Sequence, residues 1–190
     1  MGMKLAATAA NDSSVPWVLD PVAHFATPYR SRAAQELLAL GPTILRGNAS
    51  EIIGLGGQES DAKGVDAKDS VEAAEVVAVE LAKAHNLVVV VTGETDFVTD
   101  GSRIVRISGG SPVMPLVTAL GCSLTCLMGA FTAVSPPLEA AATALALFAE
   151  AGSAAAAKSN GPGSFQPLFL DALHNTTPEM LAQSERVVWL

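Results

Sequence analysis

The feature that most constrains the fold is a run of five consecutive apolar residues, Leu87 to Val91, four of which are valine. A strand buried on one face alternates apolar and polar residues, whereas a strand buried on both faces is apolar throughout. A helical pattern from Ala73 to Ala84 precedes the run, and Thr92-Gly93 ends it. The run is therefore typical of a central strand in a parallel sheet that is covered by helices.

Two further apolar runs, Trp17 to Asp20 and Thr43 to Arg46, have the composition of short buried strands. An amphipathic helix is expected between them, over Ser31 to Leu40, and Gly41-Pro42 ends it. Strands that alternate with helices define an α/β fold with a mostly parallel central sheet and helices on both faces. In the expected helix Ala34, Leu37 and Leu38 share one face.

The rest of the chain divides into elements without an internal repeat. Asn48-Ala-Ser-Glu51 has the form of a capping box, which opens a short helix that ends near Gly56. Asp100-Gly101 is a typical hairpin turn. The other expected elements are a polar loop over 58–67, a helix from Asp69 to His85, a buried helix from Cys122 to Ala133, an Ala-rich helix from Leu138 to Ala157 and a final helix from Phe165 to His174.

Charge and length exclude several classes of protein. The 190 residues carry a formal net charge of −8, and only 16% of them are charged. Nucleic-acid binding is not expected, because affinity for phosphates comes largely from Lys and Arg. Since 49% of the residues are hydrophobic, the chain has enough apolar side chains for one folded domain over 1–190. Two cysteines make no disulfide framework, so the cytoplasm is the expected compartment.

An uncharged stretch from Ile107 to Leu138 raises the question of a membrane span. Proline and glycine residues break the stretch, and its longest clean helix, Cys122 to Val134, is shorter than the roughly 20 residues that a span needs. Lys and Arg residues that would orient a span do not directly flank this helix. The N-terminus also has no long apolar segment of a signal peptide. No membrane association is therefore expected.

The candidate site residues lie where strands end, because ligands of open α/β sheets bind beyond the carboxyl ends of the strands. Asp20 can hold Mg²⁺, or it can cap a turn. Arg46 suits phosphate binding. Thr92 can meet a nucleotide phosphate, or it can be an ordinary strand exit. Glu51 suits metal or water positioning, but its box with Asn48 is sufficient as local capping.

A second candidate site is the small-residue turn Thr118-Ala-Leu-Gly-Cys122 before an apolar helix. Backbone N–H groups at a helix N-terminus bind anions, so this turn can hold a phosphoryl group. Cys122 is a candidate reactive group there, although packing is the commoner role of a cysteine in an apolar helix, and Cys126 is expected in the core. P-loop and dinucleotide fingerprints are absent, and none of the three histidines is assigned a catalytic part.

Several segments together resemble the hydroxyethylthiazole kinase family of the ribokinase-like superfamily. They occur in the family's order and extend over nearly the whole chain. RGNASE and the TGE-D-VTDG stretch are the specific ones. The matching segments are PWVLDPVA (16–23), LRGNASEI (45–52), KGVD (63–66), VVTGETDFVTDG (90–101), MPLVTALGCSL (114–124) and GPGSF (161–165).

The resemblance implies an activity: phosphorylation of the hydroxyl of 4-methyl-5-(2-hydroxyethyl)thiazole by ATP and Mg²⁺, which salvages a thiamine precursor. It also implies a homotrimer with sites at subunit interfaces. Arg46 and Thr92 match ATP-binding positions, and Asp20 and Glu51 match acidic positions around Mg²⁺ and phosphate. Residues 118–122 match the anion-hole motif, with Gly121 and Cys122 as catalytic positions and Ala119 as a substrate-binding one. Cys122 stands where most ribokinase-like enzymes have the aspartate that takes the substrate's proton, and a thiol is a modest base.

The chain departs from the family's pattern at three places. The motif reads TALGC where the family commonly has TGTGC, so the methyl group of Ala119 crowds the anion hole unless its φ is negative. His24-Phe25 stands where the family has smaller residues, which narrows the pocket. The chain is also short by roughly the first quarter of a family member, judged by length, so we expect the sheet to be incomplete on its N-terminal side.

These departures keep other functions open. The chain can be an inactive or binding-only relative of the kinase, since the TALGC change falls in the anion hole. It can also be another ribokinase-like kinase of small alcohols, such as a hydroxymethylpyrimidine, although RGNASE favours the thiazole.

Overall fold

The computed structural model describes residues 2–57 and 67–190. The KGVD segment at 63–66 lies outside the described residues, as does nearly all of the polar loop expected over 58–67. Six strands form one sheet in the order β1-β2-β3-β4-β5-β6. The strands are β1 (Val18–Leu19), β2 (Ile44–Asn48), β3 (Val88–Thr92), β4 (Thr95–Thr99), β5 (Ile104–Ser108) and β6 (Val187–Trp189).

The sheet is mixed, which corrects the expectation of a mostly parallel one. β1 pairs with β2 and β2 with β3 in parallel, but the three remaining pairs are antiparallel. For the β3–β4 and β4–β5 pairs, the reason is the length of the connections. Parallel neighbours need a crossover of a dozen or more residues, whereas only Gly93 and Glu94 separate β3 from β4. The turn at Asp100-Gly101 joins β4 to β5, as the sequence predicts.

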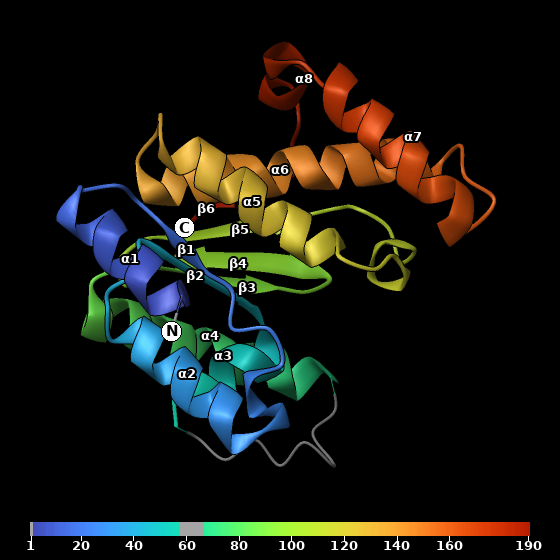
Figure 1. The fold of residues 1–190 in the computed structure, drawn as a ribbon. Helices are drawn as coiled ribbons and strands as arrows, with labels where there is room; N and C mark the ends of the chain where they lie inside the picture. The colour runs from blue at the N-terminus through green and yellow to red at the C-terminus, as the bar shows by residue number, and fades with distance from the viewer. Residues whose placement is uncertain (1, 58–66) are drawn as a thin grey trace.

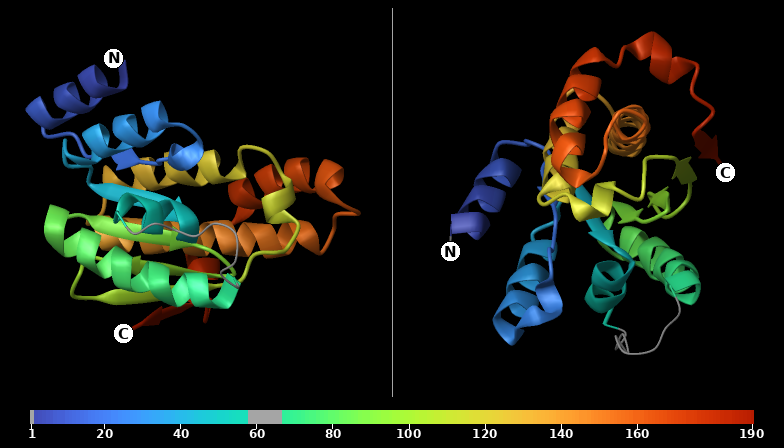
Figure 2. Two further views of the ribbon diagram at one scale, coloured as in Figure 1. Left: turned by 90° about the horizontal axis from the view of Figure 1, so that it is seen from below. Right: turned by 90° about the vertical axis from the view of Figure 1, so that its right-hand side faces the viewer.

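Helices cover both faces of the sheet (Figure 1). On one side lie α2, α3 and α4, with α1 outside β1; on the other lie α5, α6, α7 and α8 (Figures 1 and 2). The α/β prediction is confirmed. The helices are α1 (Gly2–Asp12), α2 (Pro28–Leu38), α3 (Ala49–Leu55), α4 (Ala67–His85), α5 (Leu120–Thr132), α6 (Pro137–Ala156), α7 (Pro162–Asn175) and α8 (Pro178–Ala182), with 3₁₀ turns at His24–Ala26 and Met114–Leu116.

The valine run of β3 contributes to two separate cores. Val88 and Val90 pack into the core beneath α5, α6 and α7. Val89 and Val91 pack into the core formed with α2, α3 and α4. Alternate side chains of a strand point to opposite faces, so the run is apolar throughout because both of its faces are buried. The strand inferred from this run is confirmed.

Local signals placed several elements well. On α2 the three residues predicted to share a face, Ala34, Leu37 and Leu38, are all buried. The capping box at the start of α3 is present, and that helix ends at Gly56. The helix expected to be the last is α7, but α8 and β6 follow it, so that expectation is wrong. β6 is a three-residue edge strand, too short for a recognisable pattern in the sequence.

The helix α5 is buried along one face and not all round, which corrects the expectation of a buried helix. Its buried residues, Leu120, Leu124, Met128 and Thr132, are four apart and form a single stripe. Cys126 lies off this stripe and is exposed, so its assignment to the core is wrong. Across residues 2–57 and 67–190 no helix is both long and apolar enough to cross a membrane.

Candidate functional site

Three side chains meet at the carboxyl ends of β1, β2 and β3, on the face of the sheet that α5 covers. Ile44 and Val90 belong to the core under α5. Arg46 and Thr92, each two residues further along its strand, therefore point to the same face. Asp20 directly follows β1, which pairs in parallel with β2. The three strands at whose ends the sequence places candidate site residues are therefore neighbours in the sheet.

Arg46 is the centre of this cluster. Its Nη1 donates to Asp20 Oδ2 at 3.1 Å, and its Nη2 donates to Thr92 Oγ1 at 3.0 Å. The Thr92 hydroxyl in turn donates to the carbonyl oxygen of Gly47 at 3.3 Å. The side chains of Arg46 and Asp20 are only 12% and 13% exposed. The guanidinium group is therefore held in one orientation by groups from three neighbouring strands.

The start of α5 lies against this guanidinium group. A β-carbon built on Gly121 would be 2.9 Å from Arg46 Nη1. The N-cap residue Ala119 offers no side-chain hydrogen bond, and the N–H groups of the first helical turn have no partners within the helix. Cys122 is exposed in that turn. The helix dipole, the free N–H groups and Arg46 together make an electropositive site for an anion.

Ala119 adopts the left-handed conformation, with φ 65° and ψ 8°. Its methyl group would be tolerated at a negative φ, and that condition is not met. A residue with a side chain pays roughly 1–2 kcal/mol in this region, whereas glycine pays almost nothing. The glycine of the family motif is therefore the residue that this backbone favours.

Glu51 lies on the other side of β2 from Arg46. It is 6% exposed, and a β-carbon on Gly47 would meet its side chain at 3.1 Å. Its Oε1 accepts from the backbone N–H of Ala23 and its Oε2 from that of Asn48, both at 2.9 Å. These bonds confirm the capping role and tie the loop after β1 to α3. A metal-binding role for Glu51 stays a prediction.

Two polar residues of this site were missed by the sequence analysis. The Thr125 hydroxyl donates to Asp20 Oδ2 at 2.7 Å. Asp96 accepts from the backbone N–H of Gly93 at 3.0 Å. Burial raises the pKa of Asp96 to about 6, although the Gly93 hydrogen bond and the charge of Arg46 act to lower it. Asp96 is visible within the TGETD segment, but only the sheet register brings it towards Arg46.

The residues at the DPVA departure take different positions. His24 is buried, its Nε2 lies 3.0 Å from the carbonyl oxygen of Glu51, and its ring contacts the position of Gly54 on α3. Phe25 is 54% exposed. His24 therefore packs beneath α3. Within the described part of the chain, no group of three or more His, Cys, Asp or Glu residues lies close enough together to hold a metal ion.

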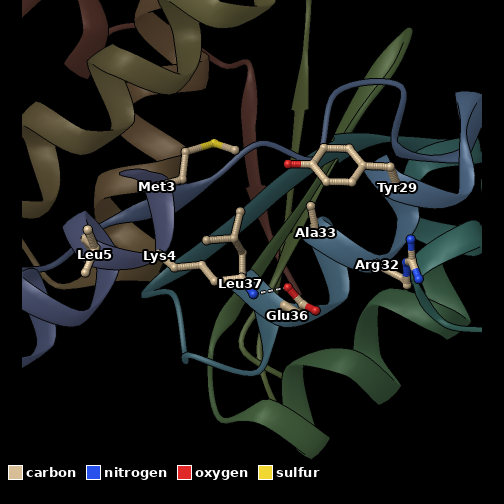
Figure 3. A pocket seen from close by; sticks show the side chains of 8 residues that line it. All are labelled: Met3, Lys4, Leu5, Tyr29, Arg32, Ala33, Glu36 and Leu37. Atoms are coloured by element: carbon tan, nitrogen blue, oxygen red, sulfur yellow. Dashed lines mark ion pairs between the residues drawn. The ribbon is translucent and has the colours of Figure 1, made fainter. Parts of the chain in front are cut away.

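A separate hollow of about 570 Å³ lies between α1 and α2 (Figure 3). Met3, Tyr29 and Leu37 are among the side chains that line it. An ion pair between Lys4 and Glu36 bridges the two helices there. All lining residues come from α1 and α2, so this hollow is distinct from the Arg46 cluster.

The fold is that of the ribokinase-like class of kinases. Pyridoxal kinase from Staphylococcus aureus, solved with AMP-PCP and pyridoxal, has the same fold with a TM-score of 0.61. It is 20% identical to this chain, and the alignment covers 80% of this chain and 57% of that one. A likeness at this level of identity concerns the fold alone.

The chain belongs to the hydroxyethylthiazole kinase family, whose model matches residues 1–179. Hydroxyethylthiazole kinase from Gemmatimonas aurantiaca is 60% identical over 99% of this chain and 68% of its own length. The hydroxyethylthiazole kinase from Rhizobium rhizogenes is 57% identical over 100% of this chain and 71% of its own length. The solved structure of the hydroxyethylthiazole kinase protein from Pyrococcus horikoshii OT3 has a TM-score of 0.89 and is 34% identical in sequence. The alignment covers 99% of this chain and 70% of that one.

Proposed function

We propose that this chain phosphorylates the hydroxyl group of 4-methyl-5-(2-hydroxyethyl)thiazole with ATP, in thiamine biosynthesis or salvage. The observation that carries the proposal is the placement of Arg46, anchored by Asp20 and Thr92, directly against the start of α5. Membership of the hydroxyethylthiazole kinase family supports the choice of substrate. The cytoplasm is the proposed location.

Positioning and charge stabilisation account for most of the catalysis in phosphoryl transfer. Arg46 and Thr92 are proposed to bind ATP phosphates. Arg46 Nε is buried and has no hydrogen-bond partner among the described residues, so one donor remains for such a ligand. The backbone N–H groups of Gly121 and Cys122, at the start of α5, are proposed to bind the transferring phosphoryl group. Ala119, which precedes them, is proposed to line the substrate site.

Cys122 is the proposed acceptor of the substrate's hydroxyl proton. Its thiol is exposed in the first turn of α5, beside the phosphoryl site that we propose. A base must lie within hydrogen-bond reach of the proton that it takes, and the exposed position of the thiol at the start of α5 supports this role. Because a thiol is a modest base, we expect its contribution to the rate to be limited.

The residues present fit a magnesium ion. Asp20 Oδ1 is buried and has no hydrogen-bond partner in the part of the chain that is described, and carboxylate oxygens are the ligands that Mg²⁺ prefers. Glu51 is the second proposed ligand because it matches the second acidic position of the family, and it would have to reach the ion from the other side of β2 while its oxygens accept the N–H groups of Ala23 and Asn48. When bound, Mg²⁺ supplies charge neutralisation at the phosphates.

The direct test of the proposed function is turnover by the purified protein. Incubation with ATP, Mg²⁺ and the thiazole alcohol should give the phosphate ester, detected by mass spectrometry, and one ADP for each ester. A hydroxymethylpyrimidine and pyridoxal serve as competing substrates. Absence of the ester, or a higher kcat/KM for the pyrimidine alcohol, would refute the proposal. Light scattering with and without substrate tests the homotrimer that we also propose.

One observation favours a second function, binding without turnover. Ala119 holds a strained left-handed φ at the turn proposed to line the substrate. A shift of this turn under strain would misplace the N–H groups of Gly121 and Cys122 while leaving Arg46 in place. Thermal unfolding distinguishes the two functions: a clear rise in Tm with the thiazole and Mg-ATP, but no ester, would establish the binding protein.

A further inference from the structure

Two hydrogen-bond donors converge on the same oxygen of Asp20. Thr125 Oγ1 lies 2.7 Å from Oδ2, and Arg46 Nη1 lies 3.1 Å from the same atom. The other oxygen, Oδ1, is buried and receives no hydrogen bond from any described residue. A carboxylate oxygen buried without a partner is costly, so this arrangement calls for a ligand at Oδ1.

The Thr125 hydroxyl has two possible acceptors and one proton. Oγ1 also lies 3.2 Å from the carbonyl oxygen of Gly121, one turn earlier in α5. The bond to Asp20 is shorter and its acceptor is charged, and charge-assisted hydrogen bonds are roughly twice as strong as neutral ones. The proton therefore goes to Asp20, and the bond connects α5 to the end of β1.

This bond joins the two halves of the site. Asp20 and Arg46 lie at the carboxyl ends of β1 and β2, whereas the N–H groups proposed to bind the phosphoryl group belong to the first turn of α5. Thr125 is one turn further along the same helix. It fixes both how far that turn lies from the carboxylate and which oxygen of the carboxylate turns away from Arg46.

We propose that Thr125 is a positioning residue that holds the Asp20 carboxylate with Oδ1 free for a hard divalent cation. The identity of the nucleotide that shares this cation rests on the proposed function, but binding of the cation itself does not. Thr125 does not touch the cation. It acts through Asp20, as partners of metal ligands commonly do.

The test compares Thr125→Val, which keeps the shape and loses the donor, with Thr125→Ser, which restores a hydroxyl. Mn²⁺ is the probe, titrated alone into the purified protein and followed by electron paramagnetic resonance. Loss of a partner of a metal ligand typically weakens metal affinity by about 10–100-fold. We expect about 10-fold weaker Mn²⁺ binding in Thr125→Val and near wild-type binding in Thr125→Ser.

Thr132→Val is the matched control on the same helix. Its hydroxyl donates to the carbonyl oxygen of Gly129 at 2.7 Å, and it is buried away from Asp20. We expect it to leave Mn²⁺ binding unchanged. Should Thr125→Val not fold, Thr125→Ala is titrated in the same way.

Three results would overturn the inference. One is a wild-type protein that binds no Mn²⁺; another is equal Mn²⁺ affinity with and without the Thr125 hydroxyl; the third is a loss in Thr125→Ser as large as in Thr125→Val. In the kinase assay we expect Thr125→Val to raise the Mg²⁺ concentration needed for half-maximal rate while the KM for the thiazole stays unchanged. A wild-type protein with no thiazole turnover but the expected Mn²⁺ pattern refutes the proposed function and leaves this inference standing.

Discussion

The guanidinium group of Arg46 borders the space that a side chain at Gly121 would enter, although 75 positions separate the two residues in the sequence. A β-carbon at position 121 would lie 2.9 Å from Nη1 and 3.2 Å from Nη2. Contacts shorter than about 3.0 Å are avoided by real β-carbons, so either the arginine or the helix would have to move. Because Asp20 and Thr92 hold the guanidinium group, moving it would disturb those hydrogen bonds, so this position favours glycine.

Gly121→Ala should weaken ATP binding because the added methyl group displaces the Arg46 guanidinium from between Asp20 and Thr92. We expect the KM for ATP to rise by about 10-fold, the equivalent of roughly 1.4 kcal/mol. Gly129→Ala is the control on the same helix, since nothing lies within 4 Å of its β-carbon position. That variant should keep the KM and gain up to about 1 kcal/mol of stability. Equal KM values in both variants would contradict the contact.

Arg46→Ala should reduce nucleotide affinity more than Gly121→Ala does. It removes the proposed phosphate donors and also leaves the Asp20 carboxylate without its ion pair, so stability should fall as well. Arg106→Ala is the control, because Arg106 pairs with Glu75 at 2.6 Å on another part of the sheet. Calorimetric titration with ATP measures the affinity. Unchanged affinity in Arg46→Ala would remove this residue from the site.

Local sequence signals predicted one half of this site. Asp20, Arg46 and Thr92 were found because each directly follows or ends an apolar run, and parallel strands bring such ends together. Thr125 was not found, because its role depends on a 2.7 Å contact between residues 105 positions apart. No local pattern in a single sequence records a contact of that kind.

Two wrong predictions, the burial of Cys126 and the mostly parallel sheet, also have physical causes. Cys126 was placed in the core because α5 carries no charge, but small uncharged side chains are compatible with both exposed and buried positions. The sheet was expected to be mostly parallel because helices and strands alternate in the first half of the chain. β4 pairs antiparallel with β3 and with β5 because both connections are tight turns, and β6 pairs antiparallel with β5 after the chain returns from α8.

Glu51→Ala should destabilise the fold whatever the residue does for a metal. Its carboxylate accepts the N–H groups of Ala23 and Asn48, and both would lose their acceptor. A fully buried donor without a partner costs about 1–3 kcal/mol, and these N–H groups are partly buried, so the cost of each should lie near the lower end of that range. We expect a lower midpoint in urea and a loss larger than in Asn48→Ala, which removes one capping bond at a cost of about 1 kcal/mol. A loss in Glu51→Ala no greater than in Asn48→Ala would contradict these contacts.

Asp96→Asn should stabilise the protein at neutral pH. Burial raises the pKa of Asp96 from 3.8 to about 6, so the folded state binds this proton more tightly than the unfolded state does. Stability from this group therefore falls as pH rises from about 4 to 6, and above pH 6 the ionised carboxylate carries the full cost. Asparagine has no such charge and still accepts the Gly93 N–H. The gain at pH 7 should reach about 3 kcal/mol at most, since one pKa unit is about 1.4 kcal/mol.

Asp100→Asn is the opposite control for this pH dependence. Burial raises the pKa of Asp100, but hydrogen bonds from the N–H groups of Arg103 and Ser102 and from the Arg103 side chain outweigh it, so the pKa is lowered overall. This carboxylate contributes stability that is present above its unfolded pKa and is lost as the pH falls through its folded pKa. Asp100→Asn should therefore lower stability at pH 7. Urea unfolding at pH 4 and pH 7 measures both variants, and a change of the same sign in both would contradict the assignment.

Ala119→Gly should stabilise the chain and increase its turnover. Ala119 has a φ of 65°, which costs a residue with a side chain roughly 1–2 kcal/mol and glycine almost nothing. Glycine also makes the unfolded chain more flexible, a loss of about 0.4–1 kcal/mol, so a net gain of about 1 kcal/mol remains. For a chain of this length that gain raises Tm by about 2–4 °C.

Ala130→Gly is the control for this last prediction, because Ala130 is an exposed residue in the helical interior of α5. It should lose about 1 kcal/mol, which is the usual cost of glycine in a helix. If strain at Ala119 limits the placement of the N–H groups of Gly121 and Cys122, kcat should rise in Ala119→Gly and stay unchanged in Ala130→Gly. Calorimetry and the ester assay together decide the matter. A Tm that falls equally in both variants would show that Ala119 bears no strain.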